Sequence, residues 1–165
     1  MAEKHPVPAV RAAAVKTVVV TQDDNPNTID WLMKRVSEDD DWEPRSIATW
    51  AVMLLGGADG RALPWMRDLA LHDQDPMVRS EAIESWAFGW ATRSEERADL
   101  ASIGSNDPRP DVRVAAIRAL SGAFPGNRDV TSWLDGLAGD TDPAVRRAAE
   151  RELLGRGVLP RIPNL

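Results

Sequence analysis

The chain contains no cysteine, which excludes disulfide bonds and thiolate metal sites. It also contains no apolar run of about 18 residues, the length that a membrane-spanning helix requires. The first residues lack the apolar segment of a secretory signal peptide. We therefore expect a cytoplasmic protein without a membrane anchor.

Positive charge is scarce relative to negative charge. The 165 residues include 20 Lys and Arg against 26 Asp and Glu, a formal net charge of -6. A general nucleic-acid binder needs a basic surface to displace counterions, so a nucleic-acid partner is not expected. The acidity suits a partner with a basic surface, and it also favours solubility.

Histidine is equally scarce, and no catalytic motif stands out. His5 and His72 lie far apart without metal-ligand spacing. The glycine-rich stretch 56–60 lacks the Lys and Ser or Thr of a phosphate loop. The acidic run 38–41 lacks the glycine and the final glutamate of a calcium loop. We expect no cofactor, no metal and no catalytic residue, although the many carboxylates leave a hidden general-acid pair open.

What the sequence does contain is an internal repeat. Five arginines, separated by 34, 34, 34 and 33 residues, mark it: Arg11, Arg45, Arg79, Arg113 and Arg146. Each is followed three residues later by alanine, and the last four are preceded six residues earlier by aspartate. A fixed period of this length is typical of a solenoid of helical pairs.

Helix boundaries follow from the punctuation around each arginine. A proline stands three residues before four of the five arginines, where a helix tolerates its missing N–H. Asp41, Asp75 and Asp142 can cap the exposed amides of these helices. The pattern predicts helices over 8–20, 27–37, 43–55, 61–72, 76–91, 94–104, 110–123, 128–138 and 143–154.

Apolar positions on each Arg-bearing helix, the second helix of its pair, form one stripe. They lie one residue before and three, four and seven residues after the arginine, as in Val78, Ala82, Ile83 and Trp86. The recurring alanine suits a close crossing of helices. Ala12, one residue after its arginine, is expected on the outer face.

Tryptophan recurs on the first helix of the pairs. Trp31 and Trp65 precede their arginines by 14 residues, and Trp133 precedes Arg146 by 13. Recurrence in equivalent slots favours packing between repeats over a cofactor site.

The unit Asp-x-Asp-Pro-x-Val-Arg-x-x-Ala, seen in residues 73–82, resembles a HEAT repeat of the short bacterial kind also found in phycobilin lyases. The resemblance implies an all-α, right-handed solenoid of about 4.5 helical pairs and nine helices. It covers residues 1–157 as a single domain, and residues 158–165 would form a C-terminal tail.

The resemblance also implies a ladder of hydrogen bonds between the turn aspartates and the helix arginines. Each aspartate would pair with the arginine of its own unit or with a neighbouring one, and His5 in the first aspartate slot would end the ladder. These charged residues would then be structural: Asp39, Arg45, Asp73, Arg79, Asp107, Arg113, Asp140 and Arg146.

The side of each second helix opposite the core stripe is the expected binding surface. Its middle row reads Lys16, Trp50, Glu84, Arg118 and Arg151. Trp50 is out of step with the core, and tryptophan is frequent among binding hot spots. An alternative is that Trp50 packs on a neighbouring arginine or loop.

Charge is polarised along the chain. Residues 22–43 carry eight acidic and two basic side chains, a net of -6, whereas residues 143–165 carry five basic and two acidic ones, a net of +3. The acidic end would steer a basic partner. The candidate partner-binding residues are Trp50, Met53, Glu84, Asp40, Asp41, Trp42, Glu43 and Arg118.

These observations favour a non-enzymatic module that binds a protein in its concave groove. A narrower hypothesis is an acidic immunity or antitoxin-like protein that inhibits a basic toxin domain. Two alternatives share the repeat architecture. One is a HEAT-like DNA-repair glycosylase or nucleic-acid-binding protein, and the other is a bilin-lyase-type subunit.

Overall fold

The computed structural model describes residues 4–21, 27–57, 59–90 and 94–158. Its contacts divide the chain into two compact units, residues 1–89 (unit 1) and residues 90–165 (unit 2), which are described separately. The acidic residues Asp23 and Asp24 and the expected tail after Val158 lie outside the described residues. A single domain over 1–157 stays a prediction.

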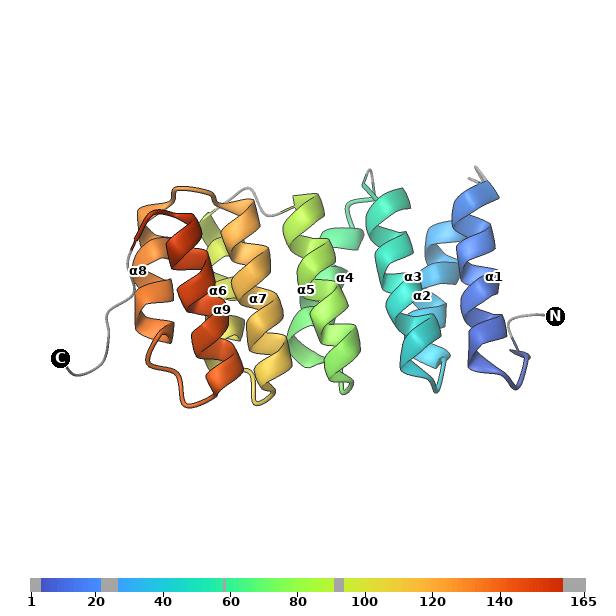
Figure 1. Ribbon diagram of the computed structural model, residues 1–165. Coiled ribbons are helices and arrows are strands. Elements are labelled where there is room, and N and C mark those ends of the chain that lie inside the picture. Colours follow the sequence, from blue (N-terminus) through green and yellow to red (C-terminus); the bar gives the residue numbers. More distant parts are fainter. Residues whose placement is uncertain (1–3, 22–26, 58, 91–93, 159–165) are drawn as a thin grey trace. The chain divides into compact units, whose positions relative to one another are not determined.

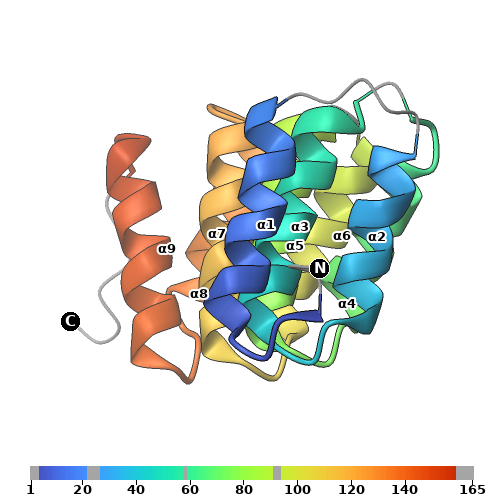
Figure 2. The same cartoon turned by 90° about the vertical axis from the view of Figure 1, so that its right-hand side faces the viewer.

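Unit 1 holds two layers of helices (Figures 1 and 2). The second helices of the pairs form one layer, in which α1 packs on α3, and the first helices form the other, in which α2 and α4 contact α3. The helices are α1 (Pro8–Thr21), α2 (Thr28–Glu38), α3 (Trp42–Leu55), α4 (Ala62–His72) and α5 (Pro76–Trp90).

Unit 2 repeats this arrangement with two complete pairs. The second helices α7 and α9 pack on each other, and each also packs on the first helix of its own pair, α6 or α8. The helices are α6 (Ser94–Asn106), α7 (Pro110–Ala123), α8 (Arg128–Leu137) and α9 (Pro143–Gly155).

The predicted helices are all present, and their observed ends differ from the predicted ones by no more than two residues. No strand occurs in the described part of the chain, which confirms the all-α fold class. The expected caps form as well. The side chain of Asp41 accepts a hydrogen bond from the amide of Glu43, and that of Asp142 accepts one from the amide of Ala144.

The core stripe of the second helices is confirmed in α3, α5, α7 and α9. The recurring alanine is fully buried in all four helices, at Ala48, Ala82, Ala116 and Ala149. Trp86 is also fully buried, which matches its place in the stripe. The stripe therefore forms the contact between the two layers of each unit.

The expectation for α1 was wrong. Ala12, predicted on the outer face, is only 2% exposed, and Val10, predicted in the core, is 38% exposed. Within the described residues α1 has no first helix of its own to pack on, unlike α3, α7 and α9. Ala12 is buried because α1 packs on α3.

Trp133 bridges two repeats of unit 2, as the recurrence of tryptophan predicted. Its indole Nε1 donates a hydrogen bond of 2.9 Å to Ser105 Oγ on α6. A Cβ added at Gly104 would lie 2.6 Å from Trp133 Cζ2, so glycine is needed for the ring to fit. The repeats are thus joined through the first helices as well as the second.

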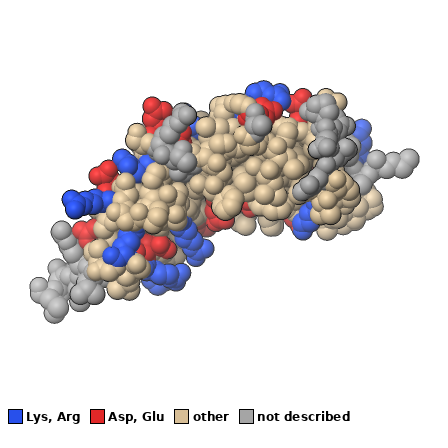
Figure 3. Space-filling view, turned by 90° about the horizontal axis from the view of Figure 1, so that it is seen from above, with Lys and Arg blue, Asp and Glu red and all other residues tan. Residues whose placement is uncertain are grey.

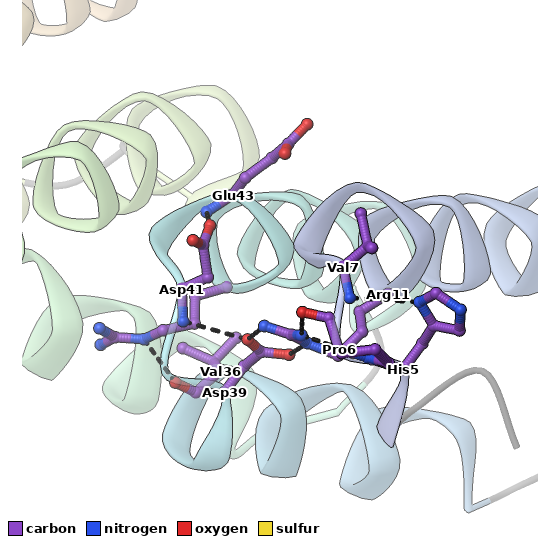
Figure 4. Close-up of polar contacts among 9 residues, drawn as sticks. His5, Pro6, Val7, Arg11, Val36, Asp39, Asp41 and Glu43 are labelled. Carbon is purple, nitrogen blue, oxygen red and sulfur yellow. Dashed lines mark hydrogen bonds and ion pairs between the residues drawn. The ribbon is translucent and has the colours of Figure 1, made fainter.

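The ladder joins Arg11, Arg45 and Arg113 each to two successive repeats, as the first rung illustrates (Figure 4). Arg11 Nη1 donates to the backbone carbonyl of His5 in its own unit at 2.7 Å. Its Nη2 and Nε donate to the two carboxylate oxygens of Asp39 in the next repeat, at 2.7 and 2.8 Å. His5 thus takes part through its backbone, although it lacks the carboxylate of the other units.

Two further rungs also join successive repeats. Arg45 pairs with Asp73, and Arg113 Nη2 lies 2.9 Å from Asp140 Oδ1. Arg113 Nη1 also donates to the carbonyl of Asp107 at 2.9 Å. Each of these three carboxylates pairs with the arginine of the preceding repeat. Of the two expected pairings, the one with a neighbouring repeat is therefore present for these three aspartates, and the one within the same repeat is not. In each case a backbone carbonyl of the arginine's own repeat also accepts from the guanidinium. For Arg11 and Arg113 this carbonyl lies in the turn, and for Arg45 it is that of Val36 on α2.

We predict that Ala82→Leu and Ala116→Leu each lower the free energy of unfolding by about 1–3 kcal/mol, because added volume at a fully buried contact strains the core. Ala13→Leu, on the exposed side of α1, is the matched control and should change it little. Urea unfolding measures all three variants. Equal stabilities would show that the assigned contact face is wrong.

We also predict that Arg113→Ala lowers the free energy of unfolding by about 1.5–3 kcal/mol, because the carboxylate of Asp140 and the carbonyl of Asp107 lose their charged hydrogen-bond donor. Arg118→Ala removes the same side chain from an exposed position of the same helix and serves as control. A comparable loss in both variants, measured by chemical unfolding, would contradict a stabilising role for the ladder.

Candidate partner-binding site

Trp50 lies on the exposed side of α3, away from the contact between the layers. Its side chain is 40% exposed, and Lys16 on α1 and Glu84 on α5 occupy equivalent exposed positions. Trp50 is therefore a solvent-accessible aromatic on a helical face, as its place outside the core stripe predicted.

A groove surrounds Trp50 within unit 1. It has a volume of about 470 Å³ and runs over the second helices α1, α3 and α5. Apolar side chains provide most of its wall, and two charged and one hydroxyl-bearing side chain complete it. The lining residues are Lys16, Val19, Val20, Ser46, Ile47, Trp50 and Glu81.

Glu81 is the single carboxylate of this groove. Its oxygens accept hydrogen bonds from Ser85 Oγ at 3.2 Å and from Ser46 Oγ at 3.4 Å. Burial raises the pKa of Glu81 above its ordinary value, the bond from Ser85 opposes the rise, and the nearby charge of Glu84 adds to it. A half-buried carboxylate thus lies beside apolar side chains.

Further apolar side chains are exposed on the second helices of unit 1. Val20, Leu54 and Phe88 each follow their arginine by nine residues, and Val20 and Phe88 are 81% and 82% exposed. Met53, a predicted binding residue, is half-buried and does not line the groove. Its Cγ lies 3.3 Å from where a Cβ at Gly89 would stand, so it packs toward α5.

The first four residues of the acidic segment 38–43, residues 38–41, line a different cavity of about 560 Å³ together with Lys4, Arg11 and Arg35. Its charges are largely engaged. Asp39 is buried against Arg11, Asp41 caps α3, and Glu38 lies 2.9 Å from Arg35. Asp40 is exposed, Glu43 is half-buried and Trp42 is 44% exposed.

Trp50 and residues 38–41 line separate cavities, and contact of one partner with both stays a prediction. The predicted binding residue Arg118 and other exposed arginines of the second helices belong to unit 2. Arg118, Arg147 and Arg151 are exposed on α7 and α9, and Figure 3 shows blue side chains gathered on this unit, at the left of the view. Arg118 thus lies in the other unit from Trp50.

Glu81 was missed by the sequence reasoning, although a signal for it exists. It follows its arginine by two residues, and the same slot in the other units holds Ala13, Ile47, Ala115 and Ala148. Ala115 and Ala148 are buried in unit 2. A charged residue in a slot that is otherwise apolar departs from the repeat, and only the three-dimensional groove reveals what it faces.

A family model described as HEAT repeats matches residues 1–87 and 98–157. The chain belongs to the HEAT-repeat family. A search of curated proteins found no match. None of the described helices has the length and apolar character that a membrane crossing requires. Within the described residues, no three metal-binding side chains gather into a cluster.

The charge state of Asp39 should affect the stability of unit 1. Burial by itself raises the pKa of Asp39, but hydrogen bonds from Arg11 and from the amide of Asp41 outweigh it and hold the pKa below its ordinary value. Such a carboxyl stabilises the fold above the unfolded pKa of about 3.9, and this stabilisation is lost as the pH falls through the folded pKa.

We predict that Asp39→Asn lowers the free energy of unfolding at neutral pH and that its difference from the natural protein shrinks below about pH 3.9. Asp40→Asn, on an exposed neighbour, should change little at either pH. Chemical unfolding at several pH values provides the comparison. A difference for Asp39→Asn that stays constant down to acidic pH would contradict the assigned ion pair.

Proposed function

We propose that this HEAT-repeat protein is a non-enzymatic interaction module that binds another protein through the second-helix face of unit 1. The observation that carries the proposal is the Trp50 groove, a largely apolar depression with an exposed tryptophan in its wall. Interface hot spots are enriched in tryptophan and lie in pockets that the partner desolvates.

The exposed row of Val20, Leu54 and Phe88 supports a macromolecular partner. Large apolar side chains that remain exposed together on a soluble domain are typical of protein contact surfaces. The row lies on the same three helices as the groove, so a partner that enters the groove can also cover these side chains. Burying them would add to the hydrophobic contribution to binding.

A narrower form of the proposal is an immunity or antitoxin-like protein that inhibits a basic toxin domain. The net charge of -6 supports a basic partner. In this form the exposed acidic side chains, such as Asp40, would act at the rim and accelerate association, while Trp50 would provide affinity.

We predict that Trp50→Ala weakens binding of the natural partner by about 2 kcal/mol or more, because a desolvated aromatic anchor is lost. The partner is first captured from the host by a photo-crosslinker placed at Lys16, and its affinity is then measured by surface plasmon resonance. Circular dichroism checks that the variant stays folded, which its exposure predicts.

Trp42→Ala is the matched control, since Trp42 is an exposed tryptophan outside the groove. It should leave the affinity nearly unchanged. Loss of binding in Trp42→Ala with full binding in Trp50→Ala would place the contact at the acidic segment instead and overturn the proposed groove.

A further inference from the structure

The environment of Glu81 departs from what the repeat requires. In the four other repeats the residue two positions after the arginine is apolar, so the fold forms without a carboxylate there. Glu81 is nevertheless retained at a half-buried position, where burial disfavours its charged form. Two serine hydroxyls, from Ser85 and Ser46, orient its oxygens. Orientation by neutral donors alone leaves its negative charge uncompensated.

No cation within the described residues forms an ion pair with Glu81. Lys16 lines the same groove, but it extends from α1, whereas Glu81 extends from α5, and no ion pair joins them. Ser46, Ile47 and Trp50 of α3 complete the groove. The groove therefore combines an uncompensated carboxylate toward α5, an apolar centre and a single positive charge toward α1.

We propose that the Trp50 groove recognises a partner segment in which an arginine or lysine lies next to an apolar side chain, and that Glu81 is the residue that selects the basic group. This inference rests on the proposed function and specifies the chemistry of the partner. The apolar side chain packs on Trp50 and Ile47, and the cation pairs with Glu81.

The complementarity of charge and polarity supports this occupant over a purely apolar one. An apolar segment would desolvate Glu81 without replacing the lost water contacts, which costs free energy. A guanidinium or ammonium replaces them with a charge-assisted hydrogen bond. Lys16 disfavours a second cation toward α1, so the basic group of the segment is directed toward α5.

The test selects peptides from a displayed random library against the full chain and measures the binding of synthetic copies by calorimetry. We expect the enriched peptides to share a basic residue beside an apolar one. Glu81→Gln should weaken their binding on the order of tenfold or more, because a desolvated charged pair is lost. Glu95→Gln, an exposed carboxylate of unit 2 that does not line the groove, is the control and should have little effect.

The pH dependence provides a second readout when the peptides contain no Asp, Glu or His. Binding to the natural protein should weaken as the pH falls toward the ordinary glutamate pKa of about 4.3, and the loss should begin above that value because the pKa of Glu81 is raised. Binding to Glu81→Gln should show a much smaller change over the same range.

The outcomes separate this inference from the proposed function. Peptides that lose affinity in Trp50→Ala but not in Glu81→Gln would overturn the role of Glu81 and retain the groove as a binding site. Peptides that depend on neither residue, or a library that enriches no sequence, would contradict both. Equal losses in Glu81→Gln and Glu95→Gln would reduce the effect to general charge and also overturn the inference.

Discussion

The arrangement of each unit depends on one contact, a guanidinium held between two successive turns. Arg11 and Arg113 each donate to a backbone carbonyl of their own turn and to the carboxylate of the next turn, as Arg113 does to Asp107 and Asp140. Arg45 donates to the carbonyl of Val36 on α2 and pairs with Asp73 of the next turn. A planar guanidinium can make both contacts at once, whereas an ammonium provides no such fork. The contact therefore fixes each of these second helices relative to the turn that precedes the second helix of the next repeat.

The groove lies over second helices that the ladder links. Arg45 on α3 pairs with Asp73, which lies in the turn between α4 and α5. Further along the same two helices, Ser46 reaches Glu81, and Trp50 lines the groove beside it. The buried alanines Ala48 and Ala82 allow the layers to approach closely. The structural residues face inward, so the outward face is free to differ from one repeat to the next.

The period of the arginines was enough to predict the fold, because each unit carries its own start signal, cap and core stripe. The same signals explain the accuracy of the helix ends. They failed at α1, where Val10 is exposed and Ala12 is buried, since the stripe assumes a first helix to pack on and α1 has none within the described residues.

The candidate site was predicted less completely. The exposure of Trp50 follows from its helical position. The pairing of Asp39 with Arg11 depends on contacts between neighbouring repeats, which the spacing of the arginines does not define. Glu81 shows the converse limit, because a departure from the repeat pattern is visible in sequence, whereas the groove that gives it meaning is not.

The most direct test of this account is a double-mutant cycle on Arg45 and Asp73, with the free energy of unfolding measured for Arg45→Ala, Asp73→Asn and the double variant. If the guanidinium bridges successive turns, the two substitutions should be strongly non-additive, with a coupling energy on the order of 1–3 kcal/mol. Additive effects, within about 0.5 kcal/mol, would show that the pair does not hold α3 to the following turn and would contradict the ladder as the basis of the fold.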